Sequence, residues 1–325
     1  MTTQTELSIA LANFDRHVPF FLGWLPEVDG FRLRALDVGI NTPGRDGTDR
    51  HGRMLRDGEF DIAEVSLASY IMARTRGAKL TAVPVFPRRL FSQNHIYVKR
   101  GRGIVAPDDL RGKRVALRAF QVSLSVLAKG DLKSHYGVPW ESVEWLVEED
   151  EQIAWSHRLP NVRRMAPGQT SADLLAAGEV DALIDPRPPA AVLDGQNGVA
   201  PLFADQRAAC LDYYEATDTF PIMHLLVMRS ELAERFPSLP RYLIDAWEDA
   251  QRKTRIAYED YAYTSMPFGR LAWQDDARRF GDSLWRSGLN ANRAGLERFV
   301  GYLTDQHLLE RAPVLDELFH ESVRG

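Results

Sequence analysis

The sequence predicts a two-lobed α/β protein, and three observations lead to this fold class. The chain has 325 residues, more than one hydrophobic core usually organises. A strand–helix–strand pattern occupies residues 60–86, and a second α/β pattern starts at residue 107. Such alternation indicates parallel strands joined by crossover helices. Two such units therefore predict two α/β lobes.

The first unit is predicted from patterns that are local in the chain. Apolar and polar side chains alternate at Leu7–Leu11 and at Phe31–Ala35, as they do in strands. Asn13–His17 leads into an apolar helix with Pro19 in its first turn, where a missing N–H costs nothing. The unit is completed by a strand at Phe60–Val65, a helix capped by Ser66 and closed by Gly77, and a strand at Leu80–Phe86.

The second unit repeats this kind of alternation. Thr170–Asp173 matches a capping box, in which a hydroxyl and a carboxylate satisfy free N–H groups, and Gly178 ends that helix. One more strand is expected at Ile222–Val227, and the chain beyond it is predicted to be helical. The remaining predicted elements are a helical turn at Pro107–Leu110, strands at 114–117, 143–147 and 180–184, and a helix from Ser123 to near Gly137.

Two segments, Val85–Tyr97 and Tyr214–His224, are candidates for the connections between the lobes. If both cross, lobe 1 consists of residues 1–92 and 222–325 and holds both termini, and lobe 2 is an insertion of residues 93–221. Two crossing strands form a hinge, which lets a cleft close on a ligand. Ligands of open α/β sheets bind beyond the carboxyl ends of the strands, so the residues that follow each strand are candidates for the site.

Composition argues against several classes of protein. A net charge of −5 does not suit a nucleic-acid surface, which needs a basic excess. Cys210 is the only cysteine, so no internal disulfide can form, and a buried inert thiol is expected. Residues 1–10 do not resemble a secretory signal, and no apolar run approaches the roughly 18 residues that span a bilayer. A cytoplasmic protein without a membrane partner is therefore expected.

Cofactor motifs are also missing from the sequence. The eight histidines show no paired spacing of the kind that ligates metals, so no metal site is predicted, although scattered side chains leave a divalent metal open. No glycine-rich phosphate loop and no Gly-x-Ser-x-Gly elbow occurs. We therefore expect neither a nucleotide cofactor nor serine-hydrolase chemistry.

Several segments carry a family resemblance that covers nearly the whole chain. The most specific are FPRR at 86–89 and FPIMH at 220–224. The others are ALANFDR at 10–16, RMLRDGEFDIAEVSLASYI at 53–71, PDDLRGKRVAL at 107–117, LLAAGEVDALIDPRPP at 174–189 and LWRSGLNANRAGLERFVGYLTDQHLL at 284–309. On these segments the chain resembles the 4,5-dihydroxyphthalate decarboxylase family. The resemblance implies a type II periplasmic-binding-protein-like fold and, for the family, loss of CO2 from a hydroxylated aromatic acid in phthalate catabolism.

The chain departs from the family pattern at three places. Phe91-Ser92-Gln93-Asn94 stands where the family usually reads Phe-Arg-His-Ser. Leu127 and Lys129 stand where the family has Trp and Arg, and Glu148-Glu149-Asp150 replaces a Gly-Gly turn. These departures leave the substrate, and the reaction itself, open.

The resemblance to FPIMH and FPxR directs attention to His224 and Arg89, and positions at or after strand ends add Glu64 and Arg187. His224 is assigned to proton delivery, because a histidine can donate a proton near neutral pH; a lone histidine on an apolar strand is otherwise a core or hinge residue. Glu64 either orients that histidine or polarises a ring hydroxyl, and the alternative is an ion pair with an arginine such as Arg53. Arg89 and Arg187 are assigned to the substrate carboxylates, against surface ion pairing as the alternative.

The other candidate binding residues follow strands or begin helices. Ser66 is expected to cap a helix, and a cap at a cleft edge can also present N–H groups to an anion. Arg16 is expected either to bind substrate or to pair with Asp15 at a helix start. The complete set of candidate substrate-binding residues is Arg89, Arg187, Ser66, Ser69, Arg16, Arg53, Gln121 and Ser123.

Three functions remain open on the sequence alone. The preferred one is a cofactor-independent decarboxylase whose partner is a small aromatic carboxylate. The second is a non-catalytic binding protein for small anions that serves a transporter, and the third is a related lyase or hydrolase with another anionic substrate. Whether the chain forms a homo-oligomer is left open.

Overall fold

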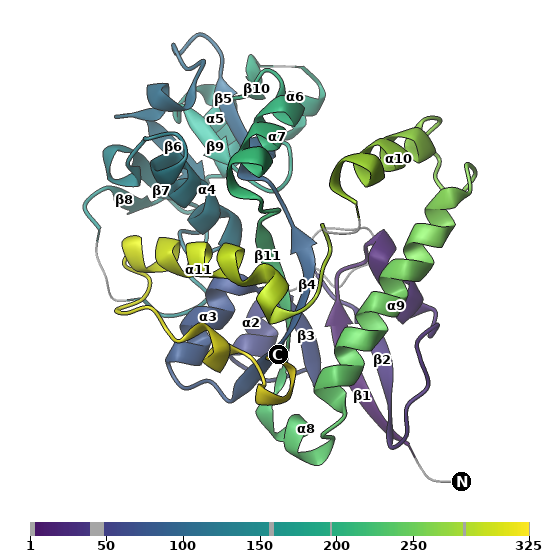
Figure 1. The fold of residues 1–325 in the computed structure, drawn as a ribbon. Coiled ribbons are helices and arrows are strands. Elements are labelled where there is room, and N and C mark those ends of the chain that lie inside the picture. Colours follow the sequence, from purple (N-terminus) through teal and green to yellow (C-terminus); the bar gives the residue numbers. More distant parts are fainter. Residues whose placement is uncertain (1–3, 40–48, 156–158, 196, 282–283, 325) are drawn as a thin grey trace. The chain divides into compact units, whose positions relative to one another are not determined.

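The computed structural model describes residues 4–39, 49–155, 159–195, 197–281 and 284–324 of the chain. The chain divides into two compact units (Figure 1). Unit 1 comprises Met1–Arg88, His224–Arg293 and Pro313–Gly325, and unit 2 comprises Arg89–Met223 and Ala294–Ala312. The chain therefore passes four times from one unit to the other, between residues 88 and 89, 223 and 224, 293 and 294, and 312 and 313.

Unit 1 is built on a five-stranded sheet with the order β2-β1-β3-β11-β4. β1 runs parallel to both β2 and β3, whereas β11 is antiparallel to β3, with His224 opposite Ser66. The carboxyl ends of β1 and β3 and the beginning of β11 therefore meet at one edge. The strands are β1 (Thr5–Leu11), β2 (Phe31–Asp37), β3 (Ile62–Ser66), β4 (Leu80–Arg89) and β11 (Ile222–Arg229).

Helices pack apolar side chains against this sheet. The longest, α9, turns Leu243, Trp247 and Ala250 inward, at a spacing that keeps them on one helical face, and these side chains join Ile9 and Val85 of the strands in one core. The helices of unit 1 are α1 (Val18–Phe21), α2 (Arg50–Leu55), α3 (Leu67–Thr75), α8 (Ser230–Arg235), α9 (Leu239–Glu259) and α10 (Gly269–Phe280), with short 3-10 turns at Asp15–His17, Leu315–Leu318 and Glu321–Val323.

Unit 2 holds a six-stranded sheet with the order β10-β5-β9-β6-β7-β8. Its strands are β5 (Ile96–Lys99), β6 (Arg114–Leu117), β7 (Glu144–Val147), β8 (Val162–Arg164), β9 (Ala182–Ile184) and β10 (Val199–Pro201). Its helices are α4 (Ser123–Ser134), α5 (Ser171–Ala177), α6 (Ala190–Leu193) and α7 (Gln206–Thr217), with 3-10 turns at Ser92–His95, Pro107–Leu110 and Trp140–Ser142. Thr170 caps α5 by accepting from the N–H of Asp173, and Gly178, with a positive φ, ends the helix, as expected. Among the described residues, however, the Asp173 carboxylate accepts from the Thr170 hydroxyl and not from a backbone N–H.

One helix, α11 (Leu289–Asp305), contributes residues to both units. The sequence predicts that all of residues 222–325 belong to lobe 1, and these lobe boundaries stay a prediction. In the division into compact units, residues 294–312 belong to unit 2. Within the described parts of the chain, no helix is both long and apolar enough to span a membrane.

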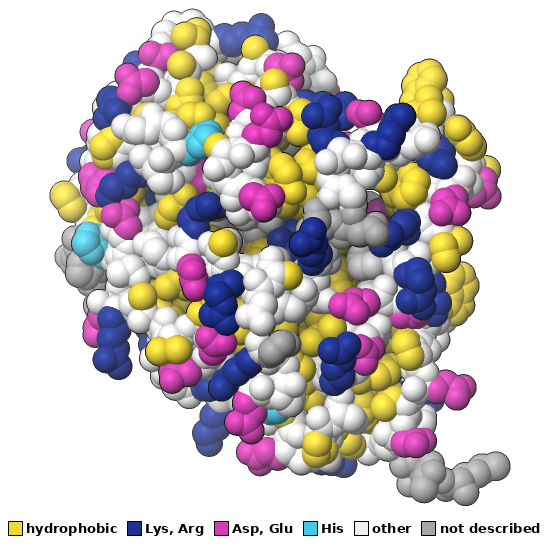
Figure 2. All heavy atoms as spheres, in the orientation of Figure 1, with side chains coloured by type: hydrophobic (Ala, Val, Ile, Leu, Met, Phe, Trp, Pro, Cys, Tyr) yellow, Lys and Arg dark blue, Asp and Glu magenta, His cyan; other side chains and the backbone are white. Residues whose placement is uncertain are grey.

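The surface view shows acidic and basic side chains interspersed over the visible face (Figure 2). Hydrophobic side chains gather toward its upper right, over the region of α10. Exposed large hydrophobic residues near the end of α9, in the segment between α9 and α10, and in α10 are Ile256, Tyr261, Tyr263, Met266, Phe268 and Leu271.

Candidate functional site

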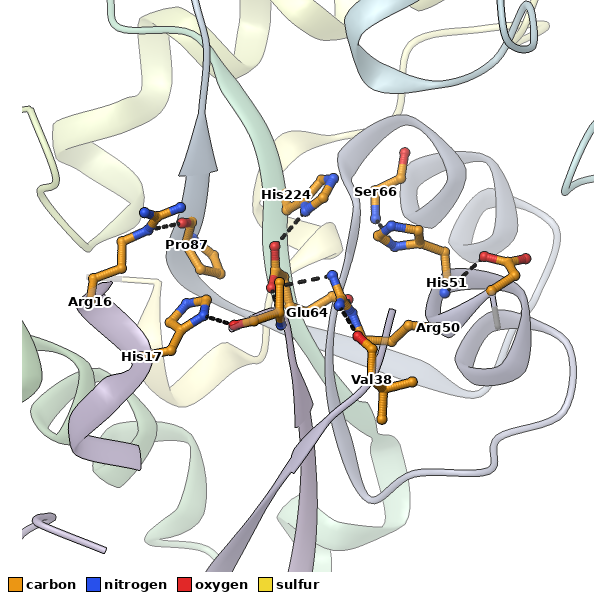
Figure 3. A network of polar contacts seen from close by, with 11 residues as sticks. Arg16, His17, Val38, Arg50, His51, Glu64, Ser66, Pro87 and His224 are labelled. Atoms are coloured by element: carbon orange, nitrogen blue, oxygen red, sulfur yellow. Dashed lines mark hydrogen bonds and ion pairs between the residues drawn. The ribbon is translucent and has the colours of Figure 1, made fainter. Parts of the chain in front are cut away.

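A buried carboxylate, Glu64, is the centre of a polar cluster in unit 1 (Figure 3). Its side chain is fully buried in β3. Oε1 lies 2.5 Å from Nδ1 of His224, and Oε2 accepts a hydrogen bond of 3.0 Å from the backbone N–H of Ala12. Arg50 places Nη2 at 3.2 Å from the same Oε2. Both carboxylate oxygens are thus occupied by protein groups.

Arg50 is the arginine that pairs with Glu64, and Arg53 is not. Arg50 opens α2, is buried, and also donates to the carbonyl oxygens of Glu64 and Val38 at 2.7 and 2.5 Å. Arg53 instead donates to Glu59 at 2.6 Å and lies over the ring of Phe60. The alternative considered for Glu64, an ion pair with an arginine, is therefore present, but the arginine is Arg50 and not the example Arg53. In this short helix Arg50 faces β3, whereas the guanidinium of Arg53 reaches the loop that follows the helix.

The charges of this cluster follow from its contacts. Burial alone would raise the pKa of Glu64, but the charge of Arg50 and the hydrogen bond with His224 hold it well below the usual range. Burial lowers the pKa of His224 to about 4, although Glu64 acts in the opposite direction. At neutral pH the pair is therefore a carboxylate and a neutral imidazole. Its Nδ1–H donates to Glu64, which leaves the lone pair on Nε2.

A second histidine, His51, lies beside His224. The two ring centroids are 4.8 Å apart, with the rings in edge-to-face orientation. Nδ1 of His51 accepts a 2.9 Å hydrogen bond from the backbone N–H of Ser66. Burial, His224 and Arg50 lower the pKa of His51 well below the usual value, so this ring is also neutral. Because Nδ1 is the acceptor, the proton of the neutral ring is on Nε2.

Sequence reasoning did not find Arg50 and His51. Both lie at the start of a two-turn helix that has no apolar periodicity, directly before the segment whose family resemblance starts at Arg53. The available signal was Asp49, which caps α2 by accepting from the N–H groups of His51 and Gly52. That signal predicts a helix start without showing that the helix faces the end of β3.

Ser66 and Ser69 have the structural role that was expected for Ser66. The Ser66 hydroxyl accepts a 3.4 Å hydrogen bond from the N–H of Ser69 and so caps α3. Both residues are buried. The contribution of Ser66 to the cluster is its backbone N–H, which orients His51.

Arg16 and His17 border the cluster on another side. Nδ1 of His17 lies 2.5 Å from the carbonyl oxygen of Ala12, and burial lowers the pKa of His17 to about 4. Arg16 donates through Nε to the carbonyl of Pro87 at 2.6 Å, and it also pairs with Asp15 at 3.3 Å. The expected local ion pair is confirmed, and the Pro87 contact fixes this guanidinium in unit 1.

A cavity of about 590 Å³ in unit 1 extends from Arg16 between α9 and α10. Its lining includes Tyr258, Trp273 and Trp285, and the Arg16 guanidinium lies 4.6 Å from the centre of the Trp285 ring. The volume is in the range of small-molecule sites. The aromatic walls suit a planar ligand, and the charged lining contains both carboxylates, such as Asp15 and Glu248, and arginines.

Four predicted site residues belong to unit 2. Arg89 is buried, donates through Nη1 to the Phe220 carbonyl at 2.9 Å, and has its pKa lowered to about 9 by burial. Gln121 donates to the carbonyl of Ile153, whereas Ser123 is the buried first residue of α4. Arg187 is exposed over 55% of its side chain and lies 3.9 Å from Asp185.

Metal-ligating side chains are not clustered in the described residues. Across 4–39, 49–155, 159–195, 197–281 and 284–324, no group of three or more histidine, cysteine, aspartate or glutamate side chains is arranged to hold a metal ion.

Comparison with solved structures identifies the fold. The chain covers 99% of the periplasmic aliphatic sulphonate-binding protein of Escherichia coli and is itself covered to 99%, with a TM-score of 0.58 at 14% identity. The alkanesulfonate-binding protein of Xanthomonas axonopodis, bound to MOPS, gives a TM-score of 0.59, also at 14% identity over 98% of this chain and 99% of that one. The desulfurization enzyme DSZB gives 0.51 at 18% identity, over 97% of this chain and 96% of that one. The fold is therefore the predicted two-lobed, type II periplasmic-binding-protein-like α/β fold.

Comparison with relatives in sequence identifies the family as well as the fold. A family model described as NMT1/THI5 like matches residues 30–149. A 4,5-dihydroxyphthalate decarboxylase of Comamonas testosteroni is 32% identical over 332 aligned residues, which cover 98% of this chain and 97% of that protein. A protein of the same name from Pseudomonas putida is 32% identical over 65% of this chain and 82% of its own length. The chain belongs to the 4,5-dihydroxyphthalate decarboxylase family.

Proposed function

We propose that this protein is a carboxy-lyase that removes CO2 from a hydroxylated aromatic acid, with 4,5-dihydroxyphthalate as the first candidate. The named relatives support the reaction class. The single observation that carries the proposal is the buried pair of Glu64 and His224, in which Nδ1 is held by the carboxylate. Among the described residues Nε2 of His224 has no hydrogen-bond partner, so it is available to a ligand.

The chemistry requires a proton at one ring carbon. In a 4,5-dihydroxyphthalate each carboxyl-bearing carbon is para to a hydroxyl, whose oxygen supplies electrons to that carbon. The carbon accepts a proton, the bond to the carboxylate breaks, its electron pair returns to the ring, and CO2 leaves. One proton is consumed and one ring C–H bond is formed. An enzyme for this reaction must deliver the proton and hold the carboxylates.

We assign proton delivery to Nε2 of His224. The imidazole is neutral without ligand, because burial outweighs the effect of Glu64. A substrate that carries two negative charges favours the imidazolium by direct attraction, so His224 takes up a proton from solution when substrate binds. The cation that forms is stabilised by Glu64 at Nδ1. Transfer of the Nε2 proton to the ring carbon returns the neutral imidazole.

Glu64 is an orienting residue in this proposal. The sequence left open whether it orients His224 or polarises a ring hydroxyl. Its Oε1 is occupied by His224 and its Oε2 by Ala12 and Arg50, which supports the first role. The carboxylate fixes the ring and the tautomer, and it stabilises the imidazolium.

Arginines remain the candidates for the carboxylate that stays on the ring. Arg89 and Arg187, assigned to this role from the sequence, stay predictions in unit 2, and Arg16 is the candidate in unit 1 because it lines the aromatic-walled cavity. We further propose that the reaction needs no cofactor, that the partner is a small aromatic carboxylate, and that the protein acts in the cytoplasm.

The test is direct. Pure protein is incubated with 4,5-dihydroxyphthalate, with and without a metal chelator, and CO2 and dihydroxybenzoate are quantified. We expect both products in equal amounts, at a rate that the chelator does not change. The sulphonate-binding neighbours favour one other function, anion binding alone. Tight binding of the phthalate without CO2 release would support that function and contradict ours.

A further inference from the structure

Two neighbouring histidines of unit 1 present opposite hydrogen-bonding groups. His224 donates from Nδ1 to Glu64, which leaves an acceptor, or after protonation an acid, at Nε2. His51 accepts at Nδ1 from Ser66, which leaves a donor N–H at Nε2. Among the described residues neither Nε2 has a hydrogen-bond partner, and Figure 3 shows the two rings next to each other. A ligand that reaches both meets an acid and a neutral donor.

The neutral state of His51 is enforced by its surroundings. A second ring proton would have to be placed on Nδ1, where the N–H of Ser66 already points at 2.9 Å. The charged groups that face the ring are Arg50, Arg88 and Glu64, together with His224, and the arginines and His224 disfavour a further positive charge. The two arginines thus outnumber the one carboxylate. A histidine held in this way acts as a hydrogen-bond donor and not as an acid.

We propose that His51 holds the departing carboxylate of the substrate through Nε2–H, next to the ring carbon that His224 protonates. This inference rests on the proposed decarboxylation. The ring carbon and the oxygens of its own carboxylate are two bonds apart, so groups that serve both positions must come from neighbouring side chains. Ring centroids 4.8 Å apart meet that condition.

A neutral donor suits the departing carboxylate better than a cation does. This group loses its negative charge as CO2 forms, so a positive charge beside it stabilises the bound substrate more than the transition state. Such binding lowers KM but also lowers kcat. A neutral N–H can orient the group with a much smaller loss, whereas the carboxylate that keeps its charge can be held by arginine.

The test compares two substitutions at one position. His51→Gln keeps an acceptor and a donor without charge, and His51→Lys introduces a cation. His320→Lys, the same substitution in another part of unit 1, is the matched control. Turnover of 4,5-dihydroxyphthalate, affinity for phthalate (which lacks the hydroxyls that drive the reaction) and thermal stability are measured for each variant.

We expect a split between affinity and rate. His51→Lys should bind phthalate about fivefold more tightly, because a charged hydrogen bond replaces a neutral one, and its kcat should fall about tenfold or more. His51→Gln should keep kcat within about tenfold of the unmodified protein, and His320→Lys should change neither value. Equal losses of affinity and rate in His51→Lys, or unchanged values, would overturn the proposal.

A measurement that does not need turnover separates this inference from the proposed function. Nitrogen-15 NMR of the histidine side chains should show His51 with its proton on Nε2 from pH 5.5 to 8, and phthalate should shift that N–H resonance. If phthalate shifts it but no hydroxylated phthalate releases CO2, the proposed reaction fails and His51 remains a carboxylate donor. If CO2 is released but phthalate leaves the resonance unchanged, the role of His51 is wrong and the proposed function stands.

Discussion

At the scale of single residues, the buried charge of Glu64 organises the site. It draws together the end of β1 through Ala12, the start of α2 through Arg50 and the start of β11 through His224. A buried carboxylate needs such partners, since an unpaired charge in the interior is strongly destabilising. Glu64 and His224 were predicted because both lie near strand ends within segments that resemble the family. Arg50 and His51 were not, because contact with β3 depends on tertiary packing of a helix without a periodic pattern.

The first prediction concerns the ion pair of Arg50 and Glu64. Arg50→Ala should lower the free energy of unfolding by about 3–5 kcal/mol, because it leaves a buried carboxylate without its main positive partner. Arg53→Ala, three residues away on the same helix and paired with the more exposed Glu59, should cost less than about 1 kcal/mol. Urea unfolding of both variants provides the comparison. Similar losses in the two variants would contradict the central place of Arg50.

The pH dependence of the reaction tests the direction of proton transfer at His224. The pKa of this residue in the free protein is about 4, so the protonated fraction falls as pH rises above that value. If His224 is the acid, kcat/KM should decrease from pH 5.5 to 8, by at most about tenfold per pH unit. The steady-state rate with a phthalate substrate is measured across this range. An increase of kcat/KM with pH would instead show that Nε2 acts as a base.

At the scale of elements, a helix or strand could be predicted where the pattern that defines it lies within one segment of the sequence. Strands β1 to β4 and β11, the Ser66 cap and the ends of α5 follow from alternation and capping residues. Strands β5, β8 and β10 were not predicted; each has only three or four residues, too few for alternation alone to identify a strand. Ser92 is one of the departures from the family pattern, and the sequence alone did not indicate what it contacts. In the structure its hydroxyl donates a hydrogen bond of 2.6 Å to Asp131 of α4.

Asp131 provides a prediction for these packed elements of unit 2. It is buried and also accepts from the hydroxyls of Tyr213 and Tyr302, yet burial raises its pKa to about 7. Between pH 4 and 7 the folded state therefore binds more protons than the unfolded chain, so stability falls as pH rises. Asp131→Asn removes this ionisation. The free energy of unfolding of Asp131→Asn, relative to that of the unmodified protein, should therefore be about 2–4 kcal/mol higher at pH 8 than at pH 5.

Thermal or urea unfolding at both pH values measures this difference. Ser92→Ala removes one hydrogen bond but keeps the carboxyl group, so it serves as the control and should retain the pH dependence of the unmodified protein. A stability difference between Asp131→Asn and the unmodified protein that is the same at pH 5 and pH 8 would contradict a carboxyl that ionises near neutral pH.

At the scale of the whole molecule, the restart of the α/β pattern predicts two lobes, and the crossings at residues 85–97 and 214–224 stay predictions. The sequence did not indicate that α11 contributes residues to both units. Its apolar face, with Leu296, Phe299 and Leu303, predicts a helix but does not indicate which core it joins. Helix assignment depends on periodicity, whereas the partner of a helix depends on packing between segments far apart in the chain.

The central claim is that His224 delivers a proton in a decarboxylation, and one variant tests it most directly. His224→Gln keeps a polar side chain but removes the acid. We measure its single-turnover rate of CO2 release and its affinity for phthalate, with thermal stability as the control. The account predicts a rate lower by about 10²–10⁴, with affinity changed far less. Equal losses of rate and affinity would contradict it and show that His224 has a structural role.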